Sequence, residues 1–341
     1  MQYQLTTLAL GEVSKEMRGS VFQMKTLRSA PHYFETSVPH QVLLEDRTLM
    51  IGGRNIVFSL RGYPPDILLI QTITNVADIF SSDVFDLEDV IYKKCHEILQ
   101  EYGGAKKFSE LYSIFQVSKY EGDADQFLTH APMIASLLKS ERIELDPKEI
   151  EYTLSTNFRY AKNDLAIIDW DGAFIFDNEG NFKQAIELLT LANVQLLRHR
   201  IVDRKLDEQL EQIATLLKMP PKRFSVFRYT NKEVSRHLSE LLKHRMASFA
   251  AFQTTEREIK LIGDWYSARL YDLATHKFRI HEWKHHIKEK LDSVEDVYTA
   301  MVENFGLTRK DRAEFVQIIA FFVLQIGWFA LIILEFFYFT R

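Results

Sequence analysis

The sequence lacks the features that mark several large classes of protein. It has one cysteine in 341 residues, Cys95, so an internal disulfide bond is excluded and a reducing compartment is expected. It also lacks the G-x-G-x-x-G turn of dinucleotide-binding domains, the G-x-x-x-x-G-K-[ST] phosphate loop and the G-x-S-x-G elbow of hydrolases. The stretch from Met1 to Ser20 has no long apolar run, so we expect no secretory signal.

The composition describes a folded, slightly acidic chain. Hydrophobic residues make up 46% and charged residues 26%, which is enough apolar surface for a packed core. The formal net charge is −5, which argues against general binding to nucleic acid. No motif indicates a cofactor. We therefore expect neither nucleic acid nor a cofactor among the ligands.

Residues 1–180 have the pattern of an α/β domain. Acidic residues from about Asp86 and the glycine Gly103 indicate the two ends of a helix. A second helix is predicted in "DADQFLTHAPMIASLLKSE", which Pro132 interrupts. Short apolar runs separated by turn residues predict strands in "QVLLED", "TLMIGG", "NIVFSL", "DILLIQTITNV", "ELYSIFQVSKY" and "EIEYTLSTNFRYA".

A hairpin with two acidic residues closes this domain. Strands from Leu165 to Trp170 and from Ala173 to Asp177 flank an Asp-Gly pair, which is a strong signal for a tight turn. Asp169 and Asp171 face the same way along the strand, so the geometry allows a Mg²⁺ or Ca²⁺ site. The alternative is that both acids serve the turn, where such residues are common.

Residues 181–306 have the pattern of long helices. Apolar residues recur every three or four positions from Asn181 to Lys218, and a second helical block is expected from about Asn231 to Phe305, with a joint at Gly306. The first stripe resembles a coiled-coil seam between chains. A helix that packs within its own chain, with a solvated middle, is the alternative. The expected seam residues are Leu189, Leu196, His199, Asp203, Leu206, Leu210, Ile213 and Leu217.

The segment "HEWKH" has the spacing of the H-E-x-x-H motif of zinc proteases. His281 and His285 are four apart and share a helix face, so both imidazoles can reach one Zn²⁺, with Glu282 as general base. A third ligand is required, and the downstream candidates are Glu295, Glu303 and Glu314. We favour the simpler interpretation, a solvated helix face, because Trp283 and Ile287 have the spacing of the buried side.

The segment from Phe315 to Phe339 is nearly uninterrupted in its apolar character and long enough to cross a bilayer as a helix. Its strongly polar side chains are those of Gln317, Gln325 and Glu335. The two glutamines roughly share a face, so with Glu335 they are candidates to line a contact between spans. For Glu335 we favour the simpler interpretation, a lone acid that is protonated or reaches the headgroups. A buried core helix is the alternative to a span.

Basic residues stand just before this segment and set its expected orientation. The stretch "LTRKDR" ends at Arg312, and an excess of Lys and Arg normally stays on the cytoplasmic side. We therefore expect an inner-membrane or cell-membrane protein, anchored near its C-terminus by a transmembrane helix at residues 313–339. The bulk of the chain would then lie in the cytoplasm, in contact with membrane lipid.

Two stretches, "WYSARLYDLATHKFRIHEWKHHIKEKLDSVEDVY" and "QIGWFALIILEFF", resemble the required-for-meiotic-nuclear-division family, which is defined largely by a domain of unknown function. The resemblance extends over about Asp66 to Phe337. It implies a membrane-anchored, self-associating protein without catalytic activity. The order of the parts is also similar to CorA-type magnesium channels, although those have two spans and a Gly-Met-Asn signature.

The sequence as a whole predicts an α+β protein: an N-terminal α/β domain, then long helices, then one transmembrane helix. The favoured function is a homo-oligomeric, membrane-anchored scaffold or assembly protein that is not an enzyme. The alternatives are a membrane-tethered zinc metalloprotease that uses HEWKH and a CorA-like divalent-cation channel.

Overall fold

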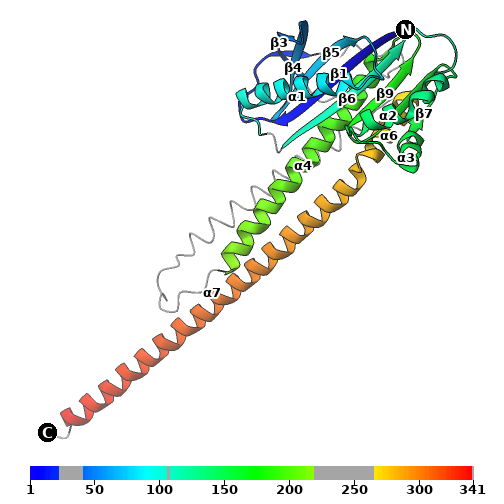
Figure 1. Cartoon of the computed structure of the whole chain (residues 1–341). Helices are drawn as coiled ribbons and strands as arrows, with labels where there is room; N and C mark the ends of the chain where they lie inside the picture. Colours follow the sequence, from blue (N-terminus) through cyan, green and yellow to red (C-terminus); the bar gives the residue numbers. More distant parts are fainter. Residues whose placement is uncertain (23–40, 106–107, 219–264, 340–341) are drawn as a thin grey trace. The chain divides into compact units, whose positions relative to one another are not determined.

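A computed structural model describes residues 1–22, 41–105, 108–218 and 265–339 (Figure 1). Strands dominate the first half and long helices the second, as the sequence predicts. Of the second helical block expected from Asn231 to Phe305, residues 231–264 lie outside the described residues, and the remainder is helical apart from a turn at residues 278–279. The elements are β1 (Gln2–Glu12), β2 (Ser20–Phe22), β3 (Gln41–Ile51), β4 (Arg54–Tyr63), β5 (Ile67–Val76), α1 (Asp83–Glu101), β6 (Ser109–Ser118), η3 (Ala124–His130), α2 (Ala131–Leu138), α3 (Pro147–Ser155), β7 (Asn157–Phe158), β8 (Asp164–Ile168), β9 (Gly172–Asp177), α4 (Lys183–Lys218), α6 (Trp265–Lys277) and α7 (Ile280–Phe339).

The strands form one sheet in the order β2-β3-β4-β5-β1-β6-β9-β8-β7. Neighbouring strands are antiparallel, except that β6 and β9 run parallel, with Ser113 beside Gly172. The central strand β1 was not predicted from the sequence. Both of its faces are buried, from Leu5 to Gly11, so its sequence lacks the apolar–polar alternation by which a half-exposed strand is recognised.

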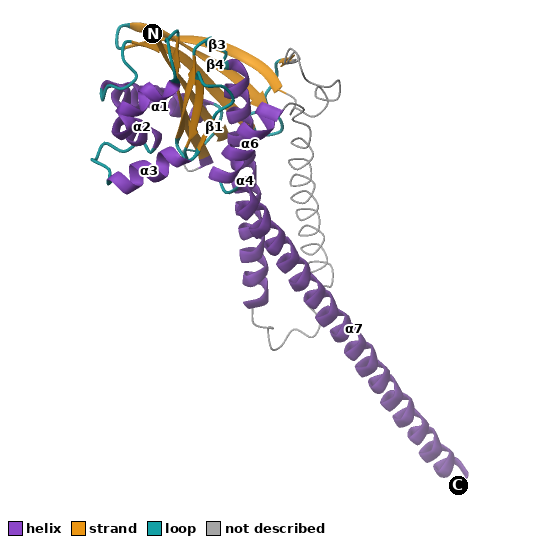
Figure 2. Cartoon of the chain, turned by 90° about the vertical axis from the view of Figure 1, so that its right-hand side faces the viewer, coloured by secondary structure: helices purple, strands orange, loops and turns teal. Residues whose placement is uncertain are grey.

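Helices cover both faces of the sheet (Figure 2). On one face, α1, η3 and α2 pack on side chains such as Leu5 and Phe174. On the other face, α4 and α6 pack on side chains such as Leu8 and Ile114. The sheet therefore lies between two helical layers, which explains why so many strand residues are buried on both sides.

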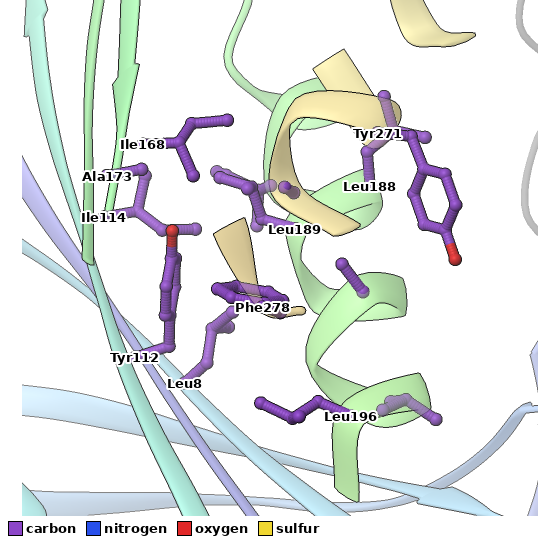
Figure 3. Close-up of a cluster of buried hydrophobic side chains, with 14 of the residues drawn as sticks. Leu8, Tyr112, Ile114, Ile168, Ala173, Leu188, Leu189, Leu196, Tyr271 and Phe278 are labelled. Carbon is purple, nitrogen blue, oxygen red and sulfur yellow. The ribbon is translucent and has the colours of Figure 1, made fainter. Parts of the chain in front are cut away.

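The core between the sheet and helices α4 and α6 is built from apolar side chains of both layers (Figure 3). Leu189 and Leu196 of α4 and Phe278, which follows α6, are 0–2% exposed, as are Leu8 and Tyr112 of the sheet. Burial of one such side chain contributes about 1.5–3 kcal/mol. Helix α4 is thus part of the core of the sheet domain.

One expected strand is a helix. The segment "EIEYTLSTNFRYA" was expected to form a strand, but Pro147–Ser155 forms α3 and only Asn157–Phe158 pairs as β7. The Asp146 side chain accepts a hydrogen bond from the backbone N–H of Lys148, and Pro147 occupies the first turn. These are strong helix-start signals, and they outweigh the alternating pattern that follows.

Contacts divide the chain into two compact units, Met1–Leu206 with Met246–Lys288 and Asp207–Arg245 with Glu289–Arg341. The expected boundary at residue 180 therefore does not separate units, because the first part of α4 packs on the sheet. The expected joint at Gly306 is also absent, since α7 continues through it as one helix. A glycine inside a helix costs only about 1 kcal/mol, which a long helix tolerates.

Candidate functional site

The β8–β9 hairpin carries the buried carboxylate of Asp169, which is 3% exposed. Its Oδ1 accepts a hydrogen bond from the backbone N–H of Trp170 at 2.7 Å, and its own backbone N–H donates to Gly172 O at 2.8 Å. Two ammonium groups lie against the carboxylate: Lys277 Nζ is 3.0 Å from Oδ1, and Lys139 Nζ is 3.4 Å from Oδ2. Asp169 thus joins the hairpin to the ends of α2 and α6.

Asp171, the other candidate metal ligand, lies in the turn of the same hairpin. Burial and the neighbouring carboxylate of Asp169 raise its pKa to about 6, and Lys139 opposes this shift. The two aspartates are therefore close enough to influence each other, as the sequence suggests. The partners of Asp169 are lysines rather than further acids. Among the described residues, no group of three or more His, Cys, Asp or Glu side chains is placed to hold a metal ion.

The joint between α6 and α7 lies directly beside this hairpin. Phe278 is fully buried, with its ring edge-on to Tyr112 at 5.5 Å and to Trp170 at 6.1 Å between centroids. Figure 3 shows Phe278 between the sheet side chains Leu8 and Tyr112 and the helix that carries Leu189. Arg279 follows with φ +53°, a left-handed conformation that ends α6 and lets α7 begin in a new direction. We call Lys277 to Ile280 the α7 joint.

The HEWKH residues form the first turns of α7. His281, Glu282 and His285 are exposed, whereas Ile287 is fully buried and Trp283 packs against the core. Glu282 Oε1 accepts from Arg279 Nε at 3.2 Å. A backbone hydrogen bond at the helix start, and then the Arg279 guanidinium, lower the pKa of Glu282. The two histidines share the solvent side of the helix, as the spacing predicts, and the described residues supply no third ligand.

A second buried carboxyl, missed from the sequence, lies under α1. Glu88 is 4% exposed and accepts a hydrogen bond from the Ser113 hydroxyl of β6. The Tyr92 hydroxyl is 2.6 Å from the same Ser113 Oγ. Burial raises the pKa of Glu88 to about 8, with the Ser113 hydrogen bond opposing the shift. The signal was available: Glu88 stands four residues after Val84 and three before Ile91, on the apolar face of α1.

An ion pair on the other face of the sheet fastens α4 to β4. Arg61 and Glu187 have side chains only 7% and 11% exposed, and Arg61 Nη1 lies 2.8 Å from Glu187 Oε1. The same guanidinium donates to the side-chain oxygens of Gln41 and Gln71. Such a pair costs desolvation energy but fixes the position of the helix on the strand.

Half of the expected oligomer seam is buried inside the chain. Leu189, Leu196, His199 and Leu206 are at most 2% exposed, because they pack in the core of their own chain. His199 Nδ1 lies 2.7 Å from Gln195 O. The prediction of a seam between chains is therefore wrong for this half of α4. The remaining seam residues are Asp203 and Leu210, which are half-buried, and Ile213 and Leu217, whose side chains lie outside the described residues.

The apolar segment lies in the last part of α7. Val316–Glu335 has a mean hydropathy of 2.3, spans 20 residues and has none of them buried. It is long and apolar enough to cross a membrane. Gln317, Gln325 and Glu335 are all exposed on this helix. The structure therefore contains, within the described residues, one helix that fits the expected span, four residues shorter at its far end than Phe339.

The comparisons with known proteins identify a family. The family model described as "Uncharacterized protein MJ0711, N-terminal domain" matches residues 6–183, a little more than half of the chain. The protein "Uncharacterized protein MJ0711" from Methanocaldococcus jannaschii is 27% identical over 254 residues, which cover 74% of this chain and 72% of the relative. No solved structure matches the chain. The chain belongs to the family of the uncharacterized protein MJ0711. In this chain the matched residues contain strands β2 to β9, most of β1 and the helices α1, η3, α2 and α3, and they end where α4 begins.

Proposed function

We propose that the protein is a membrane-anchored, self-associating scaffold or assembly protein without catalytic activity. The sheet domain lies in the cytoplasm and is held at the inner or cell membrane by the segment Val316–Glu335. Its ligands are membrane lipid and other copies of the chain.

The observation that carries the proposal is the exposure of this segment. Phe321, Trp328 and Phe329 are 64–71% exposed, and no residue of the segment is buried. Monomeric soluble proteins rarely expose a contiguous apolar surface of this size, whereas a 20-residue apolar helix matches the ~30 Å hydrocarbon layer of a bilayer. We therefore expect the apolar side chains of this segment to be surrounded by lipid rather than by water.

The sheet domain offers a firm attachment for the anchor. Helix α7 begins at the α7 joint, where Phe278 and Ile280 are buried and Lys277 pairs with Asp169. Helix α7 then continues without a break to Phe339. The anchor and its attachment to the fold are therefore parts of one helix.

The orientation follows from charge. Arg309, Lys310 and Arg312 precede the segment in the sequence, and basic residues next to a span favour the cytoplasmic side. The domain that precedes them is then cytoplasmic.

The likeness to the required-for-meiotic-nuclear-division family supports self-association without catalysis. The first of the two stretches that carry the likeness lies on α6 and the first part of α7, and the second lies in the apolar segment. Kinship with that family is part of the proposal, beyond the membership in the MJ0711 family.

Flotation with lipid vesicles tests the anchor. The full chain, reconstituted in phosphatidylcholine and phosphatidylglycerol vesicles, is expected to float in a density gradient and to resist extraction at alkaline pH. A chain that ends at Ala313 is expected to remain at the bottom. The control is Val57→Lys, which charges an apolar residue of β4 that is 46% exposed, and it should float like the wild type. A truncated chain that floats would refute the anchor.

The same preparation tests the two other functions expected from the sequence. A zinc protease requires stoichiometric zinc that is lost in His281→Ala, and cleavage that is lost in Glu282→Gln. A cation channel requires ion flux across the vesicle membrane that Gln317→Leu changes. Zinc-free protein and vesicles without flux are expected if the scaffold proposal is correct.

A further inference from the structure

Two of the three polar side chains of the apolar segment, those of Gln317 and Glu335, fall on one line along α7. Gln317 and Glu335 are 18 residues apart, which is about five full turns at ~3.6 residues per turn, so they lie above one another. Gln325 comes eight residues after Gln317 and lies about 80° from this line. The polar residues therefore mark one side of the helix.

The same side has heptad spacing. Starting at Gln317, steps of four and three residues alternate, which is the spacing of a helix–helix contact in a left-handed pair. All of the residues at these positions are exposed in the single chain. This seam, which we call the span seam, consists of Gln317, Phe321, Leu324, Trp328, Leu331 and Glu335.

Glutamine in hydrocarbon requires a hydrogen-bonding partner. A glutamine amide has two N–H donors and a carbonyl acceptor, and the bilayer core offers neither donors nor acceptors. Glu335 ends the segment and can reach water, but Gln325 stands in its middle. Within four residues of Gln325, the indole N–H of Trp328 is the one polar side-chain group, and it can only donate. The two N–H donors of the Gln325 amide therefore need an acceptor from another helix.

We infer that the span seam binds the same seam of a second copy of the chain in a parallel pair. Copies inserted with the same orientation present Gln317 to Gln317 and place the Gln325 amides beside the same seam. An amide is complementary to another amide, because each donates to the other's carbonyl. This inference rests on the proposed function and names its partner surface: self-association occurs in the membrane, since the buried half of the α4 stripe is used inside the chain.

Cysteine cross-linking in vesicles tests the seam. Leu324→Cys and Leu331→Cys lie on the seam, whereas Ile326→Cys and Ile333→Cys lie about half a turn away at similar depths. The native cysteine, Cys95, is fully buried, so the wild-type chain measures the background level of disulfide cross-linking. After oxidation of the full chain in phosphatidylcholine and phosphatidylglycerol vesicles, we expect dimers from the two seam variants and background levels from the other two.

The glutamines are tested by their removal. Gln317→Leu with Gln325→Leu is expected to weaken the pair about three- to thirtyfold, measured by energy transfer between labelled chains at increasing lipid dilution. The control is Val316→Leu with Val323→Leu, which adds apolar surface away from the seam and should leave the affinity unchanged.

The outcomes separate this inference from the anchor. Chains that do not float refute the proposed function itself. Chains that float but cross-link equally on both sides, or not at all, overturn the span seam and leave the anchor standing. An unchanged affinity after removal of both glutamines also overturns the seam as the source of pairing.

Discussion

Lys277 Nζ lies 3.0 Å from Asp169 Oδ1, and this ion pair fastens the last residue of α6 to the β8–β9 hairpin. The side chains are 13% and 4% exposed, so the pair is shielded from water. Lys139 approaches the other carboxylate oxygen, and the ring of Phe278 packs beside the hairpin. The start of the long helix α7 is therefore held by charge and by apolar packing at the same place.

Loss of this ion pair should lower stability. In Lys277→Met the Asp169 carboxylate keeps only Lys139 as a charged partner, and we expect a loss of about 2–4 kcal/mol in the free energy of unfolding. Thermal unfolding of the detergent-solubilised chain measures it. Lys94→Met is the control, because Lys94 and Glu97 form a solvent-exposed pair, which contributes little to stability. Equal effects of the two substitutions would contradict the assignment.

Phe278 should be among the most sensitive residues of the core. Phe278→Ala removes a fully buried ring next to Tyr112, and the cavity together with the lost burial should cost about 3–5 kcal/mol. The matched control is Trp170→Ala, on the same hairpin contact but 41% exposed, with an expected loss of less than ~2 kcal/mol. Circular dichroism during heating compares the stabilities of the two variants. A larger loss of stability in Trp170→Ala would contradict the central role of the Phe278 ring in this packing.

The backbone of Arg279 should reject branched side chains. Its φ of +53° costs about 1–2 kcal/mol for an ordinary residue and more for a β-branched one. Arg279→Val is therefore expected to be less stable than Arg279→Gly by at least ~1 kcal/mol. Both variants lose the contact with Glu282, so their difference reports on the backbone alone. Equal melting temperatures would refute a left-handed joint.

Glu88 should make stability depend on pH. Burial raises the pKa of Glu88 in the folded chain from its ordinary value of 4.5 to about 8, so the folded chain retains a proton that the unfolded chain releases above pH 4.5. Its contribution is therefore fully present below pH 4.5 and is lost as the pH rises to 8. Over this range the loss is about 1.4 kcal/mol per pH unit as an upper estimate.

Glu88→Gln tests this dependence. A glutamine carbonyl can still accept the Ser113 hydrogen bond but does not titrate. The variant should match the wild type near pH 4.5 and exceed its melting temperature increasingly up to pH 8. Glu97→Gln, on the exposed side of the same helix, is the control and should show no such trend. Parallel curves for Glu88→Gln and the wild type would refute the assignment.

Local patterns predicted much of the fold. The Asp171-Gly172 turn produced the hairpin, and the apolar stripe after Asn181 produced a helix, because both depend on neighbouring residues. The candidate acids Asp169 and Asp171 could be named for the same reason. Their lysine partners could not, since Lys139 and Lys277 are distant in sequence and only the packing of α2 and α6 on the hairpin brings them to Asp169.

The surface that buries an apolar helix face depends on the tertiary structure. The stripe of α4 and the apolar segment of α7 each need a surface that shields them from water, and this need, like the length of Val316–Glu335, can be read from the sequence. The sequence does not show which surface covers each one: in the fold, Leu189 and Leu196 are buried against the chain's own sheet, whereas Phe321 and Trp328 are exposed. The reason is that the hydrophobic effect is non-directional. It depends on how much apolar area is removed from water, and it does not specify which surface covers that area, which is a property of the whole fold.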